Sequence, residues 1–211
     1  MNTGQVTKND PLPSDLGDGN GGSTGDSSDS LRDHFLLAMP GLADDVFAHS
    51  VTYLCEHNAY GAMGIVINQP LDLTVEEVLE HLDLSSAGRQ NNAPVMAGGP
   101  VHMDRGFVLH GPGPREWEAT LPVTDDVWMT TSRDILASVA ADEGPERCLI
   151  ALGYAGWSPG QLEAEIADNS WLTLPADPAI IFETPVHMRM HAAGAILGVD
   201  MNLLSAQAGH S

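Results

Sequence analysis

Basic side chains are scarce in this chain of 211 residues. Eight lysine and arginine residues stand against 29 aspartate and glutamate residues, which gives a formal net charge of −21. Lys8 is the only lysine, and the seven arginines are scattered from Arg32 to Arg189. Because binding to nucleic acid or to an anionic membrane needs clustered cations, this composition argues against both kinds of partner.

Long apolar runs and closely spaced cysteines are missing as well. No stretch approaches the ~20 apolar residues of a membrane-spanning helix, and no basic segment followed by an apolar one marks a signal peptide at the N-terminus. Cys55 and Cys148 lie far apart, each in an apolar segment, which indicates buried, reduced thiols rather than a disulfide. We therefore expect a cytoplasmic protein.

The first 30 residues differ in composition from the rest of the chain. They are rich in Gly, Ser, Asp and Asn and poor in apolar side chains, so burial cannot offset the entropy lost on ordering them. We predict a disordered tail over residues 1–30 and a single domain over residues 31–211. With 43% hydrophobic residues, a domain of this size can form one core.

Short strand patterns and short helix patterns both occur after the tail. Strands are expected at apolar runs bounded by turn residues, namely 35–39, 51–56, 64–68, 94–97, 106–110, 127–130, 148–153, 171–174 and 179–183. Helices are expected after the capping residues Asp44, Thr74, Ser132, Ser158 and Thr184. The predicted fold class is α+β, with a mixed, largely antiparallel curved sheet and helices packed against it.

The segment Gly156-Trp157-Ser158-Pro159-Gly160 matches the Gly-x-Ser-x-Gly motif of serine hydrolases. In that motif the backbone N–H after the serine helps to form the oxyanion hole, but Pro159 has no N–H. Ser158 instead fits a capping box with Gln161, in which its hydroxyl accepts a hydrogen bond from the N–H of Gln161. Loss of such a cap in Ser158→Ala should cost about 0.5–2 kcal/mol.

Two histidines, His187 and His191, have the spacing of a zinc-binding pair on a helix. The residue after His187 is Met188, so the general-base glutamate of a metalloprotease motif is missing. Both histidines also fall opposite the expected apolar stripe of the helix, which consists of Val186, Met190, Ala193 and Leu197. The sequence suggests no third ligand. We therefore expect a solvated helix face, no bound metal and no cofactor.

Two glycine-containing loops, Gly98–Pro100 and Gly153–Gln161, are candidates for a binding site, because both follow expected strands. If the loops lie together, they form a ligand or partner site. The candidate residues are Gly98, Gly99, Pro100, His102, Trp157, Gly160, Gln161 and Glu163. Paired glycines permit close approach to a ligand, but a structural turn is the other interpretation of Gly98 and Gly99. For Glu163 and Glu165 the other interpretation is a solvated helix shoulder.

An enzyme is the alternative hypothesis. Its candidate groups are His102 with Asp104, which could transfer protons, and Cys55 with His57, which could supply a nucleophile. Two of these groups would have to converge in one pocket. Packing of a buried thiol is the other interpretation of Cys55, and no motif in the chain specifies a reaction.

Six segments, in this order along the chain, resemble the YqgE/AlgH family. They are 34–40, 50–58, 61–70, 98–101, 105–110 and 152–163, of which Trp157–Glu163 is the most specific. The resemblance runs from about residue 31 to the C-terminus and implies a bacterial α+β domain, generally cytosolic. It supplies no catalytic residue, and Gln69 stands where arginine is common in the family.

Members of that family carry the label of transcriptional regulators, which conflicts with this acidic composition. The sequence has no basic recognition helix that could enter a DNA groove. We therefore expect a non-enzymatic domain that binds a small molecule or a protein, with any regulatory role exerted through that partner.

Overall fold

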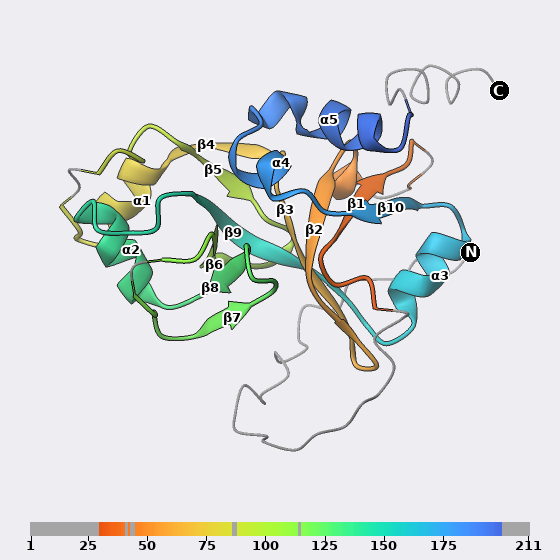
Figure 1. Ribbon diagram of the computed structural model, residues 1–211, viewed down its shortest axis with the longest axis horizontal. Helices are drawn as coiled ribbons and strands as arrows, with labels where there is room; N and C mark the ends of the chain where they lie inside the picture. Colours follow the sequence, from red (N-terminus) through yellow and green to blue (C-terminus); the bar gives the residue numbers. More distant parts are fainter. Residues whose placement is uncertain (1–29, 41, 43–44, 86–87, 114, 200–211) are drawn as a thin grey trace. The chain divides into compact units, whose positions relative to one another are not determined.

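The computed structural model describes residues 30–40, 42, 45–85, 88–113 and 115–199 (Figure 1). The predicted tail lies outside the described residues except for Ser30, and so does Asp44, the expected cap of a short helix. That helix is a single 3-10 turn, η1 (Asp45–Phe47).

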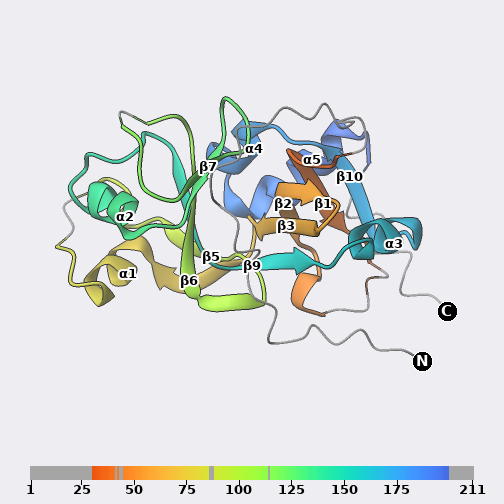
Figure 2. The same cartoon turned by 90° about the horizontal axis from the view of Figure 1, so that it is seen from below.

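Among the described residues, ten strands form a curled sheet (Figures 1 and 2). They are β1 (His34–Ala38), β2 (Val51–Asn58), β3 (Gly61–Val66), β4 (Pro70–Thr74), β5 (Pro94–Ala97), β6 (Val101–His110), β7 (Thr120–Pro122), β8 (Trp128–Thr130), β9 (Cys148–Trp157) and β10 (Trp171–Pro175). Their order is β10-β1-β2-β3-β9-β6-β8-β7, and β5 pairs with both β4 and β9. Every pairing is antiparallel except that of β5 with β9, which confirms the predicted fold class.

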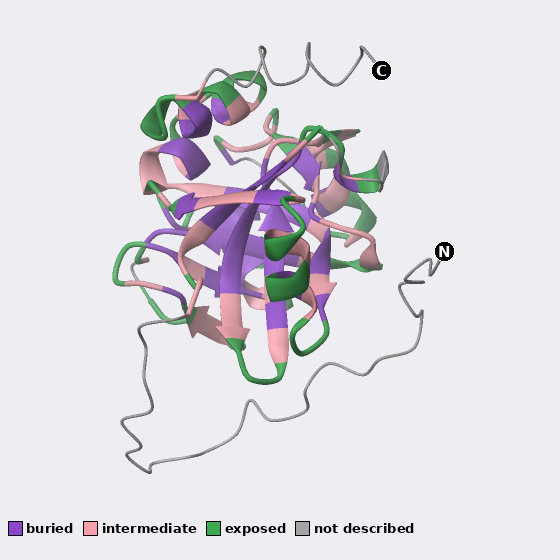
Figure 3. Cartoon of the chain, turned by 90° about the vertical axis from the view of Figure 1, so that its right-hand side faces the viewer, coloured by how far each residue is buried: buried purple, intermediate pink, exposed green. Residues whose placement is uncertain are grey.

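The long strand β9 connects two parts of the sheet. Its second half pairs with β3, and its first half pairs with β6 and β5. The buried side chains of the described residues include two clusters on different parts of the sheet. One surrounds Leu36, Leu54 and Trp157, and the other surrounds Leu79, Val108 and Ile135. Figure 3 shows that the buried residues concentrate on the strands, whereas the hairpin ends are exposed.

The curl also brings the start of β1 to the far end of the strand order. The guanidinium group of Arg32, two residues before β1, donates to the carbonyl groups of Pro122 and Val123 at the end of β7. β1 and β7 are not neighbours in the strand order. The hydrogen bonds of Arg32 therefore connect the start of β1 to the end of β7, between which there is no strand pairing.

The described residues form five short α-helices and a second 3-10 turn. They are α1 (Val75–His81), α2 (Arg133–Ala140), α3 (Gln161–Ala167), α4 (Pro178–Phe182), η2 (Val186–Met188) and α5 (Arg189–Ile196). Figure 2 shows α1 and α2 at one end of the sheet and α3 and α5 at the other. No helix in the described ranges has the length and apolar character needed to cross a membrane.

The capping box predicted at Thr74 is confirmed. Its hydroxyl accepts from the N–H of Glu77, and the Glu77 carboxylate accepts from the N–H of Thr74 at 2.8 Å. Ser132 is the N-cap of α2, as predicted, but its hydroxyl does not cap the helix. It donates instead to the carbonyl of Glu118 and to the carboxylate of Asp134.

The strand predicted at 179–183 is wrong, because Pro178–Phe182 is helix α4. The carboxylate of Asp177 accepts from the N–H of Ala179 at 2.9 Å, and Pro178 occupies the first helical position, where no N–H is needed. A short apolar run is compatible with a buried strand or a buried helix, so periodicity alone does not decide between them.

The helix predicted after Thr184 is present as η2 followed by α5, but its buried face differs from the expected one. Leu197, which the apolar stripe places inside, is 39% exposed, whereas Arg189 is only 7% exposed. The guanidinium group of Arg189 donates to the carbonyl groups of Thr184 and Ile67, and burial lowers its pKa to about 10. His187 and His191 are exposed, as predicted.

Candidate functional site

A pocket of about 420 Å³ lies between α1, α2 and the strands β6 and β9. Its lining residues are Leu73, Val78, His81, Leu82, Asp104, Gly106, Val108, Thr131, Ser132, Arg133, Leu136 and Leu152. Several of the aliphatic ones are only partly buried and pack at the edge of the second core cluster. The volume falls in the range of about 300–1,000 Å³ that is typical of small-molecule sites.

A bulge in β6 brings a carboxylate to this pocket. Val101 pairs with Tyr154 and Gly106 with Leu152, so residues 102–105 stand opposite Gly153 alone. These four residues are exposed, and His102 has a φ of 49°, in the left-handed region. Bulges often redirect side chains beside functional sites. Here Asp104, within the bulge, lines the pocket.

Three polar side chains of the pocket retain hydrogen-bonding capacity. The Nδ1 of His81 lies 2.7 Å from the carbonyl oxygen of Glu77. A carbonyl can only accept, so Nδ1 carries a proton, and in the neutral ring Nε2 is an acceptor. Arg133 donates to the carbonyl of Leu82 through one terminal nitrogen. Within the described part of the chain, the carboxylate of Asp104 has no hydrogen-bond or ion-pair partner.

The loop Gly98–Pro100 packs on β9. The N–H of Gly98 donates to the carbonyl of Leu152 at 2.8 Å, and the carbonyl of Gly98 accepts from Val66 at 2.9 Å. A Cβ on Gly98 or Gly99 would lie under 3.0 Å from backbone atoms of β9, and Gly99 has a φ of +152°. The close approach that these glycines permit is therefore made to a neighbouring strand.

The second predicted loop is largely strand, since β9 extends to Trp157 and only 158–160 form a turn. Gly98–Pro100 adjoins the middle of β9, whereas this turn follows its end. His102 stacks on Tyr154 with ring centroids 6.1 Å apart, next to the first loop. None of the eight candidate binding residues lines the pocket. Asp104, a candidate of the enzyme hypothesis, does line it.

The side-chain cap predicted at Ser158 is wrong. α3 begins at Gln161 with Gly160 as its N-cap, and no cap side chain bonds to the helix. The N–H of Gln161 instead donates to the backbone carbonyl of Ser158 at 3.0 Å. Pro159 followed by Gly160 at φ +75° is typical of a type II turn, which satisfies this N–H through the backbone. The other half of the predicted box is present, because Gln161 Oε1 accepts from the N–H of Ser158 at 3.0 Å.

We expect Ser158→Ala to change the free energy of unfolding by less than about 0.5 kcal/mol, because its exposed hydroxyl does not cap α3. Gln161→Ala should cost about 1–2 kcal/mol, since it removes the bonds to Ser158 and to Glu165. Urea denaturation of both variants measures the difference. A loss of about 1–2 kcal/mol in Ser158→Ala would contradict the turn and restore the cap.

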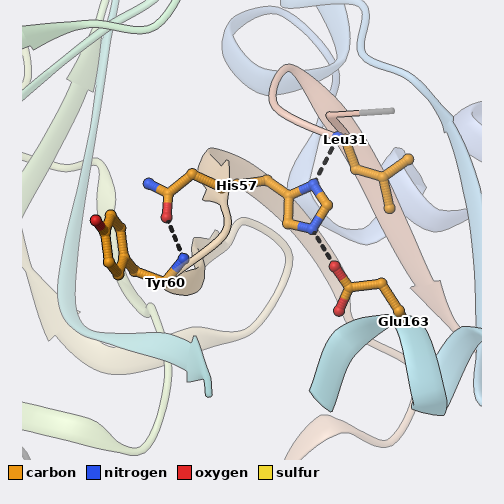
Figure 4. A network of polar contacts seen from close by, with 5 residues as sticks. Leu31, His57, Tyr60 and Glu163 are labelled. Atoms are coloured by element: carbon orange, nitrogen blue, oxygen red, sulfur yellow. Dashed lines mark hydrogen bonds and ion pairs between the residues drawn. The ribbon is translucent and has the colours of Figure 1, made fainter. Parts of the chain in front are cut away.

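His57 joins three segments of the chain (Figure 4). Its Nδ1 accepts from the N–H of Leu31 at 2.8 Å, and its Nε2 lies 2.9 Å from Oε1 of Glu163. The first contact places the ring proton on Nε2, which therefore donates to the carboxylate. A backbone N–H and the His57 ring lower the pKa of Glu163. Because both ring nitrogens are engaged, His57 is arranged as a structural bridge.

Cys55 takes no part in the hydrogen bonds of that bridge. It is fully buried, and its Sγ is 3.8 Å from the carbonyl oxygen of Tyr53. Burial raises the pKa of the Cys55 thiol and raises that of Cys148 to about 12, so both remain neutral thiols. Both cysteines are free. In the described ranges, no group of three or more His, Cys, Asp or Glu side chains could hold a metal ion.

Glu165 has a role that the sequence pattern does not reveal. Its carboxylate accepts from the indole N–H groups of Trp157 at 2.9 Å and Trp171 at 2.8 Å, and from the amide of Gln161 at 2.9 Å. The solvated shoulder is confirmed for Glu163, whose side chain is 55% exposed, and is wrong for Glu165. The spacing of Gln161 and Glu165 on one helix face is the only local signal, because Trp171 comes from a different strand.

Comparisons with known proteins agree with this fold. The AlgH-like family model matches residues 35–202. A UPF0301 protein of Thioalkalivibrio sulfidiphilus is 57% identical over 185 residues, which cover 88% of this chain and 99% of the relative. The solution structure of the AlgH protein from Pseudomonas aeruginosa is 52% identical, covers 90% of this chain and 100% of its own, and has a TM-score of 0.72. A crystal structure of a Corynebacterium diphtheriae protein, 20% identical with a TM-score of 0.62, covers 82% of this chain and 90% of its own and shares the fold.

Proposed function

This chain belongs to the AlgH-like family, and we propose that it is a non-enzymatic domain that binds a small, mainly apolar molecule in the pocket between α1 and α2. The observation that carries the proposal is the combination of an aliphatic wall with two open polar groups, the carboxylate of Asp104 and Nε2 of His81, on the same pocket. Such a combination is typical of ligand sites, in which apolar contacts supply affinity and a few polar groups orient the ligand.

The aliphatic wall supports binding on energetic grounds. Leu73, Val78, Leu82 and Leu152 are only partly buried although they adjoin the core. Covering apolar surface is worth about 25 cal/mol per Å². A ligand of suitable size would therefore gain affinity by completing the packing of these side chains.

The test fills the pocket and follows binding by NMR. In ¹⁵N–¹H spectra of the full-length protein, hexan-1-ol should cause saturable shifts at amides of pocket residues such as Gly106 and Thr131. Val78→Phe should abolish these shifts, because the larger ring occupies the pocket. Val46→Phe is the matched control, since Val46 is 50% exposed and outside the pocket. Absence of saturable shifts in the wild type would contradict the proposed function.

The proposed function does not include direct binding to nucleic acid. All seven arginines lie in the described ranges, and six of them are held by protein groups. They are Arg32, Arg89, Arg115, Arg133, Arg147 and Arg189. We expect no binding to a random DNA duplex in a polarisation titration at low salt. Saturable binding that weakens steeply with salt would contradict this expectation.

The enzyme alternative receives less support from the geometry. His102 stacks on Tyr154 and does not line the pocket that Asp104 lines. In the other candidate pair, both ring nitrogens of His57 are engaged and the Cys55 thiol is buried.

We also propose that any regulatory role passes through a bound ligand or protein partner in the cytoplasm. Cell fractionation followed by immunodetection tests the location, and recovery only in the membrane or external fraction would contradict it.

A further inference from the structure

We propose that the ligand of this pocket carries a protonated amine on an apolar body, with the carboxylate of Asp104 as the acceptor for the ammonium group. This inference rests on the proposed function of the pocket and adds the chemical class of the ligand. Asp104 carries it, because the β6 bulge presents its side chain at the pocket and no described residue pairs with it.

His81 supplies a second acceptor on the same pocket. Its Nδ1–H is committed to the carbonyl of Glu77, so in the neutral imidazole Nε2 presents a lone pair. An ammonium group has three donors and no acceptor. Such a head group can therefore donate to Asp104 or to Nε2 of His81, both of which line the pocket, whereas a carboxylate has no proton to donate to either.

Arg133 is the group that would favour an anion, but its surroundings oppose one. Its guanidinium group already donates to the carbonyl of Leu82. Beside it, the carboxylate of Asp134 accepts from the N–H groups of Ile135 and Glu118 at 2.9 Å. Hydrogen bonds to Asp134 lower its pKa against a desolvation effect that raises it, so this carboxylate stays ionised at the start of α2. An anionic ligand would meet the carboxylate of Asp104 on the pocket wall, and the one arginine of the lining is followed directly in the chain by the ionised Asp134.

The charge of the whole protein acts in the same direction. A formal net charge of −21 raises the local concentration of cations and lowers that of anions near the surface. Charge-assisted hydrogen bonds at a partly desolvated rim are stronger than neutral ones. We therefore expect an amine to bind more tightly than a neutral molecule of the same length.

The experiment compares three probes of one chain length with the full-length protein at pH 7: hexan-1-amine, hexan-1-ol and hexanoate. Dissociation constants come from NMR titrations at constant ionic strength. Hexan-1-amine should bind about tenfold more tightly than hexan-1-ol, and hexanoate should bind more weakly than the alcohol. Asp104→Asn should reduce the affinity for the amine to that for the alcohol and change the affinity for the alcohol less than about twofold.

Asp168→Asn is the matched control, because it removes the same charge at the end of α3, away from the pocket lining. It should leave the preference for the amine in place. Equal affinities for amine and alcohol, tightest binding of hexanoate, or equal effects of the two Asp variants would overturn the amine assignment while the proposed function stands. Failure of all three probes to bind would instead overturn the proposed function.

Discussion

Glu165→Ala should lower the free energy of unfolding by about 3–5 kcal/mol, because the carboxylate is the shared acceptor of three donors. Its removal leaves the indole N–H groups of Trp157 and Trp171 buried without that acceptor, and each unsatisfied buried group costs about 1–3 kcal/mol. The two rings meet edge to face with centroids 5.9 Å apart, so their displacement also disturbs the first core cluster.

Urea denaturation followed by tryptophan fluorescence measures this loss. Glu163→Ala is the matched control, because it removes the same side chain two positions earlier on α3. Glu163 is mostly exposed and pairs with one histidine, so its loss should cost about 1 kcal/mol or less. A Glu165→Ala protein no less stable than Glu163→Ala would contradict the role of Glu165 as a shared acceptor.

Gly99→Ala should destabilise the protein by about 3 kcal/mol or more, because the new Cβ would collide with the backbone of β9. The nearest atoms are the carbonyl carbon and oxygen of Tyr154 and the nitrogen of Ala155, all under 3.0 Å away. Backbone atoms of a central strand cannot move as the end of a flexible side chain can. The φ of +152° at Gly99 adds strain that only glycine avoids.

Two other glycines separate the collision from the strain. Gly160→Ala keeps a positive φ of +75° but places its Cβ in open space, so it should cost about 1 kcal/mol. Gly106→Ala has neither problem and should stay within about 0.5 kcal/mol of the wild type. Urea midpoints should therefore fall in the order Gly106→Ala, Gly160→Ala, Gly99→Ala. A Gly99→Ala protein as stable as the wild type would contradict the structural role of Gly99 and would support the prediction that Gly99 belongs to a binding loop.

Local signals in the sequence determined much of the fold. The capping box at Thr74 and Glu77 involves groups three positions apart, so the helix start could be predicted without tertiary information. The hairpin of β2 and β3 follows from two apolar runs around a short turn-rich segment. The sparse arginines and the single lysine likewise argue from composition alone against a nucleic-acid partner.

Tertiary structure decided the features whose partners come from distant segments. Periodicity cannot distinguish a short buried helix from a strand, so α4 became evident only with the Asp177 cap. Ser158 fits a side-chain cap in sequence, but in the structure the N–H of Gln161 donates to the backbone carbonyl of Ser158 through the turn at Gly160.

The candidate site shows the same division between local and distant contacts. Asp104 was a candidate for its chemistry, but His81 and Arg133 carry no local pattern that joins them to it. His81 ends α1, Arg133 begins α2, and Asp104 lies in the bulge of β6. These three segments become neighbours only when α1 and α2 pack beside β6 and β9. Glu165 likewise needs Trp171 from β10 to become a buried acceptor. Sequence determines which groups are available and how nearby residues bond, whereas packing between distant segments decides which groups meet and which remain unpaired for a ligand.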